Sequence, residues 1–345
     1  MADAPRFSVL LERVRQEVDR ELLGVWELAR RQHGGYGLAV TRPLEAAREL
    51  CLRGGKRLRA GLVAAGYRVS GGNDDLGPCL RVCCAVELLH AYFLIHDDWM
   101  DQDSLRRGGP AVHAALELHF PSPHLAASGA VLAGDYTLAL AQRELSLGVT
   151  LVPQRDEVVR RFVAMQLDAV VGQQLDVLGD GSNLDDVYRL KTGSYTVLGP
   201  LGLGLALGGA PPALGEALEA FALPLGIAFQ LRDDLLGAFG DPHMTGKPRG
   251  SDLLAGKRTL LLESALTLAD PATRALLRNL LGDRSATRER VEVALDAIDA
   301  TGARAQVEAR ITQLTAQARA ALAAFDAPAR ALLEGVLAAL VDRAS

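Results

Sequence analysis

Aromatic side chains are scarce in this sequence of 345 residues, at 5%, and there are only four cysteines. The cysteines lie in apolar stretches without the spacing of metal ligands; they are Cys51, Cys79, Cys83 and Cys84. We therefore expect free thiols on helix faces, which fits the reducing environment of the cytoplasm.

The alternating Val, Ile and Thr patterns of β-strands are also missing. Apolar residues instead follow a mostly helical spacing, and turn signals separate helical segments of roughly 15–30 residues. No linker rich in Ser, Gly or Pro divides the chain, and a hydrophobic content of 49% is ample for a buried core. We predict a single all-α domain over residues 1–345.

Several classes of protein are disfavoured. A net charge of −5 gives no reason to expect nucleic-acid binding. The N-terminal residues lack the basic start and the apolar stretch of a signal peptide. The most apolar segment, 195–210, is shorter than the ~20 residues of a membrane span, and Pro200 and several glycines interrupt it. We therefore expect no membrane span and interpret this segment as a tightly packed interior helix.

A cluster of aspartates ends one apolar helical run, with Asp97, Asp98, Asp101 and Asp103 close together. Asp97 and Asp101 stand four residues apart and would share one face of a helix. Like charges at that spacing destabilise a helix by roughly 0.2–0.5 kcal/mol per pair, so the cluster indicates a bound cation. Mg²⁺ is the natural candidate, because one or two carboxylates and the phosphates of a substrate commonly hold it.

A second acidic pair, Asp233 and Asp234, follows another apolar helical run. The two acidic segments would serve one metal site only if they face each other across a cavity, as side chains of facing helices do in bundle cores. Basic residues near both segments fit a metal–diphosphate substrate, because Arg and Lys bind the phosphate oxygens that the metal leaves. They are Lys56, Arg57, Arg59, Arg106, Arg107, Lys191, Lys247 and Lys257.

These residues fall into an ordered series of short motifs that spans residues 54–259, most of the chain. The motifs are Gly-Gly-Lys-Arg-Leu-Arg at 54–59, Glu87-Leu88-Leu89-His90, Asp97-Asp98-x-x-Asp101, Leu105-Arg106-Arg107-Gly108, Gly172-Gln173-Gln174-x-Asp176, Lys191-Thr192-Gly193, Phe229-Gln230-x-x-Asp233-Asp234, Gly246-Lys247-Pro248 and Gly256-Lys257-Arg258-Thr259. A lone DDxxD motif is weak evidence for a function, because acidic pairs are common on exposed faces. The ordered series of motifs is very specific evidence. The sequence resembles the head-to-tail isoprenyl diphosphate synthases, also called the polyprenyl synthetase family.

The resemblance implies the isoprenoid synthase fold, a helical bundle around a central cavity, and a homodimer as the usual assembly. It implies a Mg²⁺-dependent prenyltransferase, with three Mg²⁺ ions expected at the allylic diphosphate. The reaction would condense isopentenyl diphosphate with dimethylallyl, geranyl or farnesyl diphosphate into a short-chain all-trans prenyl diphosphate.

The resemblance also implies a role for each site residue. The metal ligands would be Asp97, Asp98, Asp101, Asp233 and Asp234. The pocket for isopentenyl diphosphate would contain Lys56, Arg59, His90 and Arg107. The clamp on the allylic diphosphate would contain Arg106, Lys191, Lys247 and Lys257, and the residues that flank the reacting carbon would be Thr192 and Gln230.

The second acidic segment departs from the fullest family pattern. Gly237 stands where a third aspartate often occurs, so this cluster offers fewer carboxylates. Asp241 would compensate if the helix continued, although Asp241-Pro242 is more typical of a helix end.

Two aromatic residues precede the first acidic cluster. Tyr92 and Phe93 lie five and four positions before Asp97, which places them roughly 6–8 Å below the metal ligands on a helix. Bulky rings there would form the floor of the cavity and stop elongation early. Two aromatics at these positions resemble the farnesyl (C15) synthases, so we predict a C15 product, with C20 geranylgeranyl diphosphate as the alternative.

Two other functions fit the sequence less well. A class I terpene cyclase also uses an aspartate cluster, but it would carry an Asn/Asp-x-x-Ser/Thr-x-x-x-Glu motif in the second acidic segment. A non-catalytic regulatory subunit of a heteromeric prenyl synthase would be expected to lose aspartates from the first cluster, which this chain keeps.

Overall fold

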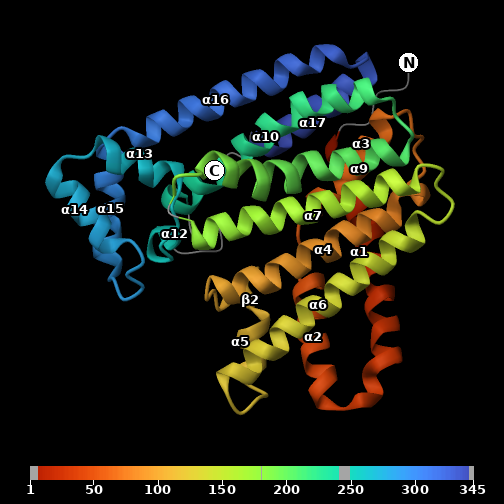
Figure 1. Ribbon diagram of the computed structural model, residues 1–345, viewed down its shortest axis with the longest axis horizontal. Coiled ribbons are helices and arrows are strands. Elements are labelled where there is room, and N and C mark those ends of the chain that lie inside the picture. Colours follow the sequence, from red (N-terminus) through yellow and green to blue (C-terminus); the bar gives the residue numbers. More distant parts are fainter. Residues whose placement is uncertain (1–6, 180, 241–248, 342–345) are drawn as a thin grey trace. The chain divides into compact units, whose positions relative to one another are not determined.

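The computed structural model describes residues 7–179, 181–240 and 249–341 (Figure 1). Helices form nearly all of the regular structure in these ranges, which confirms the all-α prediction. The strands found there are two residues long: β1 (Leu105–Arg106) pairs antiparallel with β2 (Gly109–Pro110). This short hairpin follows directly on the first acidic cluster.

The chain divides into two compact units. Unit 1 comprises residues 1–161 and 200–210, and unit 2 comprises residues 162–199 and 211–345. Helix α7 (Arg155–Leu178) begins in unit 1 and continues in unit 2. The single domain expected from the sequence stays a prediction, and each unit is described by itself.

Unit 1 is built around α4 (Gly77–Met100), in which every residue from 82 to 89 is buried. A helix that is apolar on all sides is stable only inside a core. It packs mainly against α6 (Pro123–Gly148) and α3 (Leu58–Val69). The remaining elements of unit 1 are α1 (Phe7–His33), η1 (Gly34–Tyr36), α2 (Leu38–Leu52), α5 (Val112–Glu117) and α9 (Gly199–Leu207).

The Gly-rich apolar segment 195–210 contains α9, in which every residue from Pro200 to Leu207 is buried. A Cβ atom added to Gly204 would lie 1.9 Å from the Val63 carbonyl oxygen, and one added to Gly66 would lie 2.0 Å from the Leu201 carbonyl oxygen. The backbones of α3 and α9 therefore touch, which only glycine permits. For this part of the segment, the interpretation as a tightly packed interior helix is confirmed.

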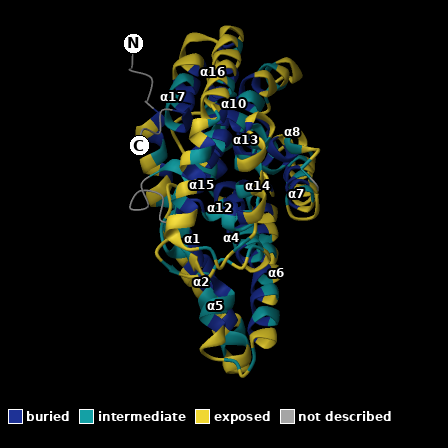
Figure 2. Cartoon of the chain, turned by 90° about the vertical axis from the view of Figure 1, so that its left-hand side faces the viewer, coloured by how far each residue is buried: buried dark blue, intermediate teal, exposed yellow. Residues whose placement is uncertain are grey.

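Unit 2 is built around α10 (Pro212–Phe239), which packs against the π-helix η2 (Tyr188–Leu198) and against α16 (Ala303–Ala321). Helix α16 buries Val307, Ile311 and Leu314 on one face and exposes most of its other residues (Figure 2). This is the pattern of an amphipathic surface helix. The remaining elements are α8 (Leu184–Val187), α12 (Ser251–Leu254), α13 (Leu260–Leu268), α14 (Pro271–Leu280), α15 (Arg288–Ala300), η3 (Leu322–Ala324) and α17 (Ala327–Val341).

Two helices, α4 and α10, are long and apolar enough to cross a membrane by length and composition. In α4, 61% of the apolar stretch is buried inside the protein, as in the core helix of a globular protein; in α10 the share is 39%. Asp97 and Asp98 lie in the last turn of α4, and Asp233 and Asp234 lie in the last two turns of α10. The absence of a membrane span stays a prediction.

Candidate active site

The first acidic cluster forms the end of α4 in unit 1. The Asp101 N–H donates to the Asp97 carbonyl at 2.7 Å, so the two residues are one helical turn apart, as the spacing predicts. Both are partly exposed, whereas Asp98 is completely buried. Asp97 and Asp101 are therefore the two carboxylates of this turn that solvent reaches.

Asp98 forms a buried ion pair that the sequence did not predict. Its Oδ1 accepts hydrogen bonds from Arg106 Nε at 2.7 Å and from Arg106 Nη2. Arg53 Nη1 donates to the Arg106 carbonyl at 3.0 Å, which ties the hairpin to the end of α2. The pair thus anchors β1 to α4. The metal-binding role of Asp98 and the diphosphate-binding role of Arg106 stay predictions.

The basic run at 54–59 is fixed by Arg57, a residue to which the sequence assigned no separate role. Its side chain is 2% exposed and donates to Asp19 Oδ1 at 2.8 Å and to the Cys51 carbonyl at 2.8 Å. It also pairs with the buried Glu87 at 3.4 Å. Arg57 adopts a left-handed backbone conformation, with φ of 48°, and its neighbour Lys56 lies exposed in the turn before α3.

The charges of several guanidinium groups act on His90. Burial holds the pKa of His90 well below its usual range, and the charges of Arg59, Arg107, Arg106 and Arg57 lower it further. His90 is therefore a neutral hydrogen-bonding group inside a strongly positive region. Arg59 and Arg107 thus both act electrostatically on His90, and the role of the three residues as a pocket for a diphosphate stays a prediction.

Arg107 joins the hairpin to the basic run. Its Nη1 donates to the Gly54 carbonyl at 2.7 Å, and a Cβ atom added to Gly55 would lie 3.3 Å from its guanidinium carbon. Gly55 has a φ of 134°, so its backbone conformation and this close approach both favour glycine.

Three rings, tilted against one another, lie in the turn that ends at Asp97. The ring centroids of Tyr92 and Phe93 are 4.9 Å apart, and those of Tyr92 and His96 are 4.6 Å apart. His96 Nε2 lies 3.3 Å from the Val131 carbonyl oxygen, and a Cβ atom added to Gly134 would lie 2.2 Å from this nitrogen. The aromatic cluster thus extends from α4 to α6. The sequence indicated Tyr92 and Phe93 as the floor of the cavity. It did not indicate His96, whose place beside these rings depends on its close contact with Gly134.

In unit 2, Asp234 is the centre of a buried hydrogen-bond chain. Its carboxylate accepts from Tyr188 Oη and from Gln230 Nε2, both at 2.8 Å. Thr192 Oγ1 donates to Gln230 Oε1 at 2.7 Å, and the Leu260 N–H donates to Tyr188 Oη at 2.8 Å. The structure therefore brings Thr192 and Gln230 together, as predicted, and adds Tyr188, which lies on the same π-helix.

The environment of Asp234 differs from that of its neighbour. Burial raises the pKa of Asp234 to about 7; the charges of Asp252 and Asp233 act in the same direction, and the hydrogen bonds from Gln230 and Tyr188 act against them. Asp233 is exposed. The metal-binding roles predicted for both stay predictions, but Asp233 is the more accessible carboxylate.

Lys191 lies on η2, and its Nζ donates to Asp176 Oδ2 on α7 at 2.5 Å. A Cβ atom added to Gly172 would lie 2.5 Å from the Lys191 backbone nitrogen, so α7 and η2 are in backbone contact. This contact explains why Gly172 and Asp176 belong to one motif. The side chain of Gln173 between them is buried, and neither of its amide atoms has a hydrogen-bond partner among the described residues.

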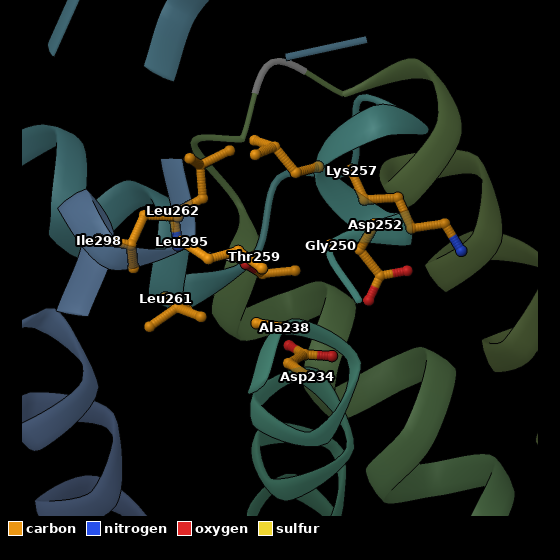
Figure 3. A pocket seen from close by; sticks show the side chains of 11 residues that line it. Asp234, Ala238, Gly250, Asp252, Lys257, Thr259, Leu261, Leu262, Leu295 and Ile298 are labelled. Carbon is orange, nitrogen blue, oxygen red and sulfur yellow. Dashed lines mark hydrogen bonds between the residues drawn. The ribbon is translucent and has the colours of Figure 1, made fainter. Parts of the chain in front are cut away.

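A small pocket in unit 2 adjoins Asp234 (Figure 3). Asp252 and Lys257 line it beside Asp234, together with apolar residues from α13 and α15. Lys257 therefore lies near Asp234 of the second acidic cluster, and its role in the clamp on the allylic diphosphate stays a prediction. Lys247 and Asp241 lie outside the described residues.

Similarity to known proteins agrees with this geometry. A family model for polyprenyl synthetase matches residues 41–298. A geranylgeranyl diphosphate synthase of Mycobacterium tuberculosis is 36% identical, and the match covers 72% of this chain and 69% of that protein. A farnesyl diphosphate synthase of Geobacillus stearothermophilus is 37% identical, and the match covers 60% of this chain and 69% of that protein. The chain belongs to the polyprenyl synthetase family. It is an enzyme of the transferase class that synthesises short-chain prenyl diphosphates.

A solved structure extends the similarity to the whole chain. Geranylgeranyl pyrophosphate synthase from Corynebacterium glutamicum, complexed with isoprenyl diphosphate and magnesium, is 34% identical. The match covers 99% of this chain and 100% of that one, with a TM-score of 0.90. The isoprenoid synthase fold expected from the sequence is therefore confirmed.

Proposed function

We propose that this enzyme condenses isopentenyl diphosphate head-to-tail with dimethylallyl, geranyl or farnesyl diphosphate and releases inorganic diphosphate. The observation that carries the proposal is the end of α4. There, two partly exposed carboxylates one turn apart, Asp97 and Asp101, occur in the same unit as the guanidinium groups whose charges act on His90. The carboxylates suit a diphosphate that is bound through a metal ion, and the guanidinium groups suit a diphosphate that cationic side chains bind directly.

The chemistry of the donors fits Mg²⁺. No group of three or more His, Cys, Asp and Glu side chains in the described ranges is arranged to enclose a metal ion. Mg²⁺ rarely needs such a cage, because one or two carboxylates, waters and substrate phosphates complete its coordination. Asp97, Asp101 and Asp233 would hold it, three ions being expected. When bound, Mg²⁺ neutralises the charge that develops on the leaving diphosphate.

The protein side chains orient the two substrates. Lys56, Arg59 and Arg107 supply the charges for isopentenyl diphosphate, and neutral His90 adds a hydrogen bond. Lys191 and Lys257 bind the allylic diphosphate. The Thr192 hydroxyl donates a hydrogen bond of 2.7 Å to the Gln230 side-chain oxygen. Both side chains present oxygen dipoles to the developing allylic cation.

In this reaction the allylic C–O bond breaks and the double bond of isopentenyl diphosphate attacks the carbon. The new C–C bond forms, and a proton leaves the adjacent carbon to regenerate a double bond. The released diphosphate accepts this proton, so the chain needs no dedicated basic side chain. Apolar residues exclude water from the cation, which would otherwise be hydrolysed.

The proposal is tested by incubating the purified chain with isopentenyl diphosphate, Mg²⁺ and each allylic primer in turn. We expect release of one diphosphate per condensation and a product whose mass grows by C5 units. A regulatory subunit would release none, and a terpene cyclase would release diphosphate from the allylic substrate alone. Chromatography with light scattering on the same sample tests the expected homodimer.

The two diphosphate pockets should separate kinetically. Lys56→Ala and Arg59→Ala are expected to raise the KM for isopentenyl diphosphate by about 10–100-fold, because a charge-assisted hydrogen bond contributes ~1.5–3 kcal/mol. Lys191→Ala should instead raise the KM for the allylic substrate, as should Lys247→Ala in the segment outside the described residues. Steady-state kinetics with each substrate varied in turn measures both effects, and equal changes in the two KM values would contradict the division.

Product length depends on the rings before Asp97. We propose that Tyr92 and Phe93 limit the product to C15, and C20 is the alternative that the names of several relatives favour. Phe93→Ala, Tyr92→Ala and the double variant should lengthen the product by one or more C5 units, as mass analysis would detect. Trp99→Ala is the matched control, since this ring on the same helix is 43% exposed beyond Asp97. An unchanged product from an active double variant would locate the floor elsewhere.

A further inference from the structure

The hydroxyl group of Tyr188 joins three elements of unit 2, although none of the sequence motifs includes this residue. It donates to Asp234 Oδ2 on α10 and accepts from the Leu260 N–H at the start of α13, both at 2.8 Å. The Tyr188 side chain is carried by η2 and is buried, so bulk water offers it no other partner. A single oxygen atom on η2 therefore links α10 to the first turn of α13.

The direction of each hydrogen bond in this chain follows from its two ends. The first N–H groups of a helix have no partner within it and can only donate, so Tyr188 accepts from Leu260 and gives its own hydrogen to Asp234. The Asp234 carboxylate accepts at both oxygens, so the amide nitrogen of Gln230 faces it and the amide oxygen faces Thr192. The Thr192 hydroxyl hydrogen is thereby directed to Gln230, and the lone pairs of the Thr192 oxygen are not used within the chain.

The carboxylate of Asp234 needs a second contact to keep this direction. The last torsion of an aspartate side chain has a broad, roughly two-fold preference, so burial alone does not decide which way the oxygens face. Tyr188 binds Oδ2, and Oδ1 then faces Gln230 Nε2. The first turn of α13 lies close by in any case, since Thr259 and Leu261 line the same pocket as Asp234 (Figure 3).

We propose that Tyr188 is a positioning residue of the allylic site. Its hydroxyl orients the Asp234 carboxylate, and this carboxylate directs the oxygens of Gln230 and Thr192 toward the developing allylic cation. The inference rests on the proposed function, and Asp234 takes part in it as a hydrogen-bond acceptor and not as a metal ligand. Tyr188 thus affects the stabilisation of charge in the transition state, and not the binding of either diphosphate.

Tyr188→Phe tests this role, because it removes one oxygen atom and keeps the buried ring. The fold should survive, with an unchanged far-ultraviolet circular dichroism spectrum. We expect kcat to fall about tenfold or more, the effect of losing one hydrogen bond to a charged group. The KM values for isopentenyl diphosphate and for the allylic substrate should change little. An unchanged kcat, or a loss that lies in the KM values alone, would overturn the inference.

A double-variant cycle asks whether Tyr188 acts through Gln230. Gln230→Met interrupts the chain between Asp234 and Thr192, so adding Tyr188→Phe should then lower kcat by less than about twofold. A further loss as large as that of Tyr188→Phe alone would contradict the proposed route. Tyr136→Phe is the matched control: its hydroxyl lies 2.8 Å from His33 Nδ1 in unit 1, and kcat should stay that of the wild type.

Ligand binding gives a second measurement that does not depend on turnover. The probes are two unreactive allylic diphosphate analogues, one with a tertiary ammonium group at the reacting carbon and one uncharged, each titrated calorimetrically with Mg²⁺ present. The wild type should prefer the ammonium analogue, and Tyr188→Phe should reduce this preference about tenfold without weakening the uncharged analogue. Asp234→Asn, which keeps the shape but cannot accept at both side-chain atoms, should do the same and serves if Tyr188→Phe does not fold. Equal losses for both analogues would instead indicate metal binding or general support of the fold, and would refute the role of Tyr188.

These measurements also separate the inference from the proposed function. A wild-type chain that makes no prenyl diphosphate contradicts the function, yet an ammonium preference that Tyr188→Phe abolishes would still support the role of Tyr188. An active wild type whose ammonium preference and kcat both persist in Tyr188→Phe contradicts the inference alone.

Discussion

Asp97→Ala and Asp101→Ala are each expected to lower kcat by about 10²–10³-fold or more, the loss found when one group that stabilises developing charge is removed. These carboxylates are the two that solvent reaches on the last turn of α4, and neither is buried in the core as Asp98 is. The fold should therefore survive, and the far-ultraviolet circular dichroism should stay that of the wild type. Asp233→Ala should be similarly severe.

Two comparisons sharpen this prediction. Asp156→Ala removes a carboxylate that is 95% exposed on α7, and it should leave kcat unchanged. Asp98→Ala should instead destabilise the protein, because it leaves the Arg106 guanidinium without its main partner on α4. Near-wild-type turnover of Asp97→Ala at saturating Mg²⁺ would contradict the assignment of the first acidic cluster.

The difference between Asp97 and Asp98 shows what the sequence can and cannot predict. Helical spacing alone puts Asp97 and Asp101 on one face, so their relation follows from a local rule. The inward orientation of Asp98 depends on Arg106, which reaches it only because the chain turns back in the β1–β2 hairpin. Such a turn is set by tertiary contacts that the residue order does not display.

Unit 2 illustrates the same limit. The motif Lys191-Thr192-Gly193 was predicted to matter, but its π-helical conformation was not, because that widened turn leaves no distinctive periodicity in the sequence. The conformation places Tyr188 and Thr192 on one hydrogen-bond chain to Asp234.

Glu87→Ala is expected to lower the free energy of unfolding by about 3–5 kcal/mol, the range found when one partner of a buried ion pair is removed. The side chains of Arg57 and Glu87 are 2% and 3% exposed, so water cannot replace the lost carboxylate. Glu87 Oε1 also accepts from the Ala60 N–H at 3.1 Å, a bond that the first turn of α3 would lose. Denaturant unfolding followed by circular dichroism measures the change.

A double variant tests whether charge is the cause. Arg57→Met combined with Glu87→Leu removes both charges and should recover part of the loss, because a packed apolar pair can replace a buried ion pair. Glu45→Ala, which breaks a partly exposed pair with Arg48 on α2, should cost less than about 1 kcal/mol. A Glu87→Ala protein as stable as Glu45→Ala would show that the network does not support unit 1.

The same network connects stability to substrate binding. Arg57 lies between Lys56 and Arg59, so the contacts that hold its guanidinium also fix the turn from which both predicted ligands of isopentenyl diphosphate project. Glu87→Gln, which keeps the shape and removes the charge, should therefore raise the KM for isopentenyl diphosphate while the KM for the allylic substrate changes little. An equal rise in both values would mean that the network supports the fold without positioning this pocket.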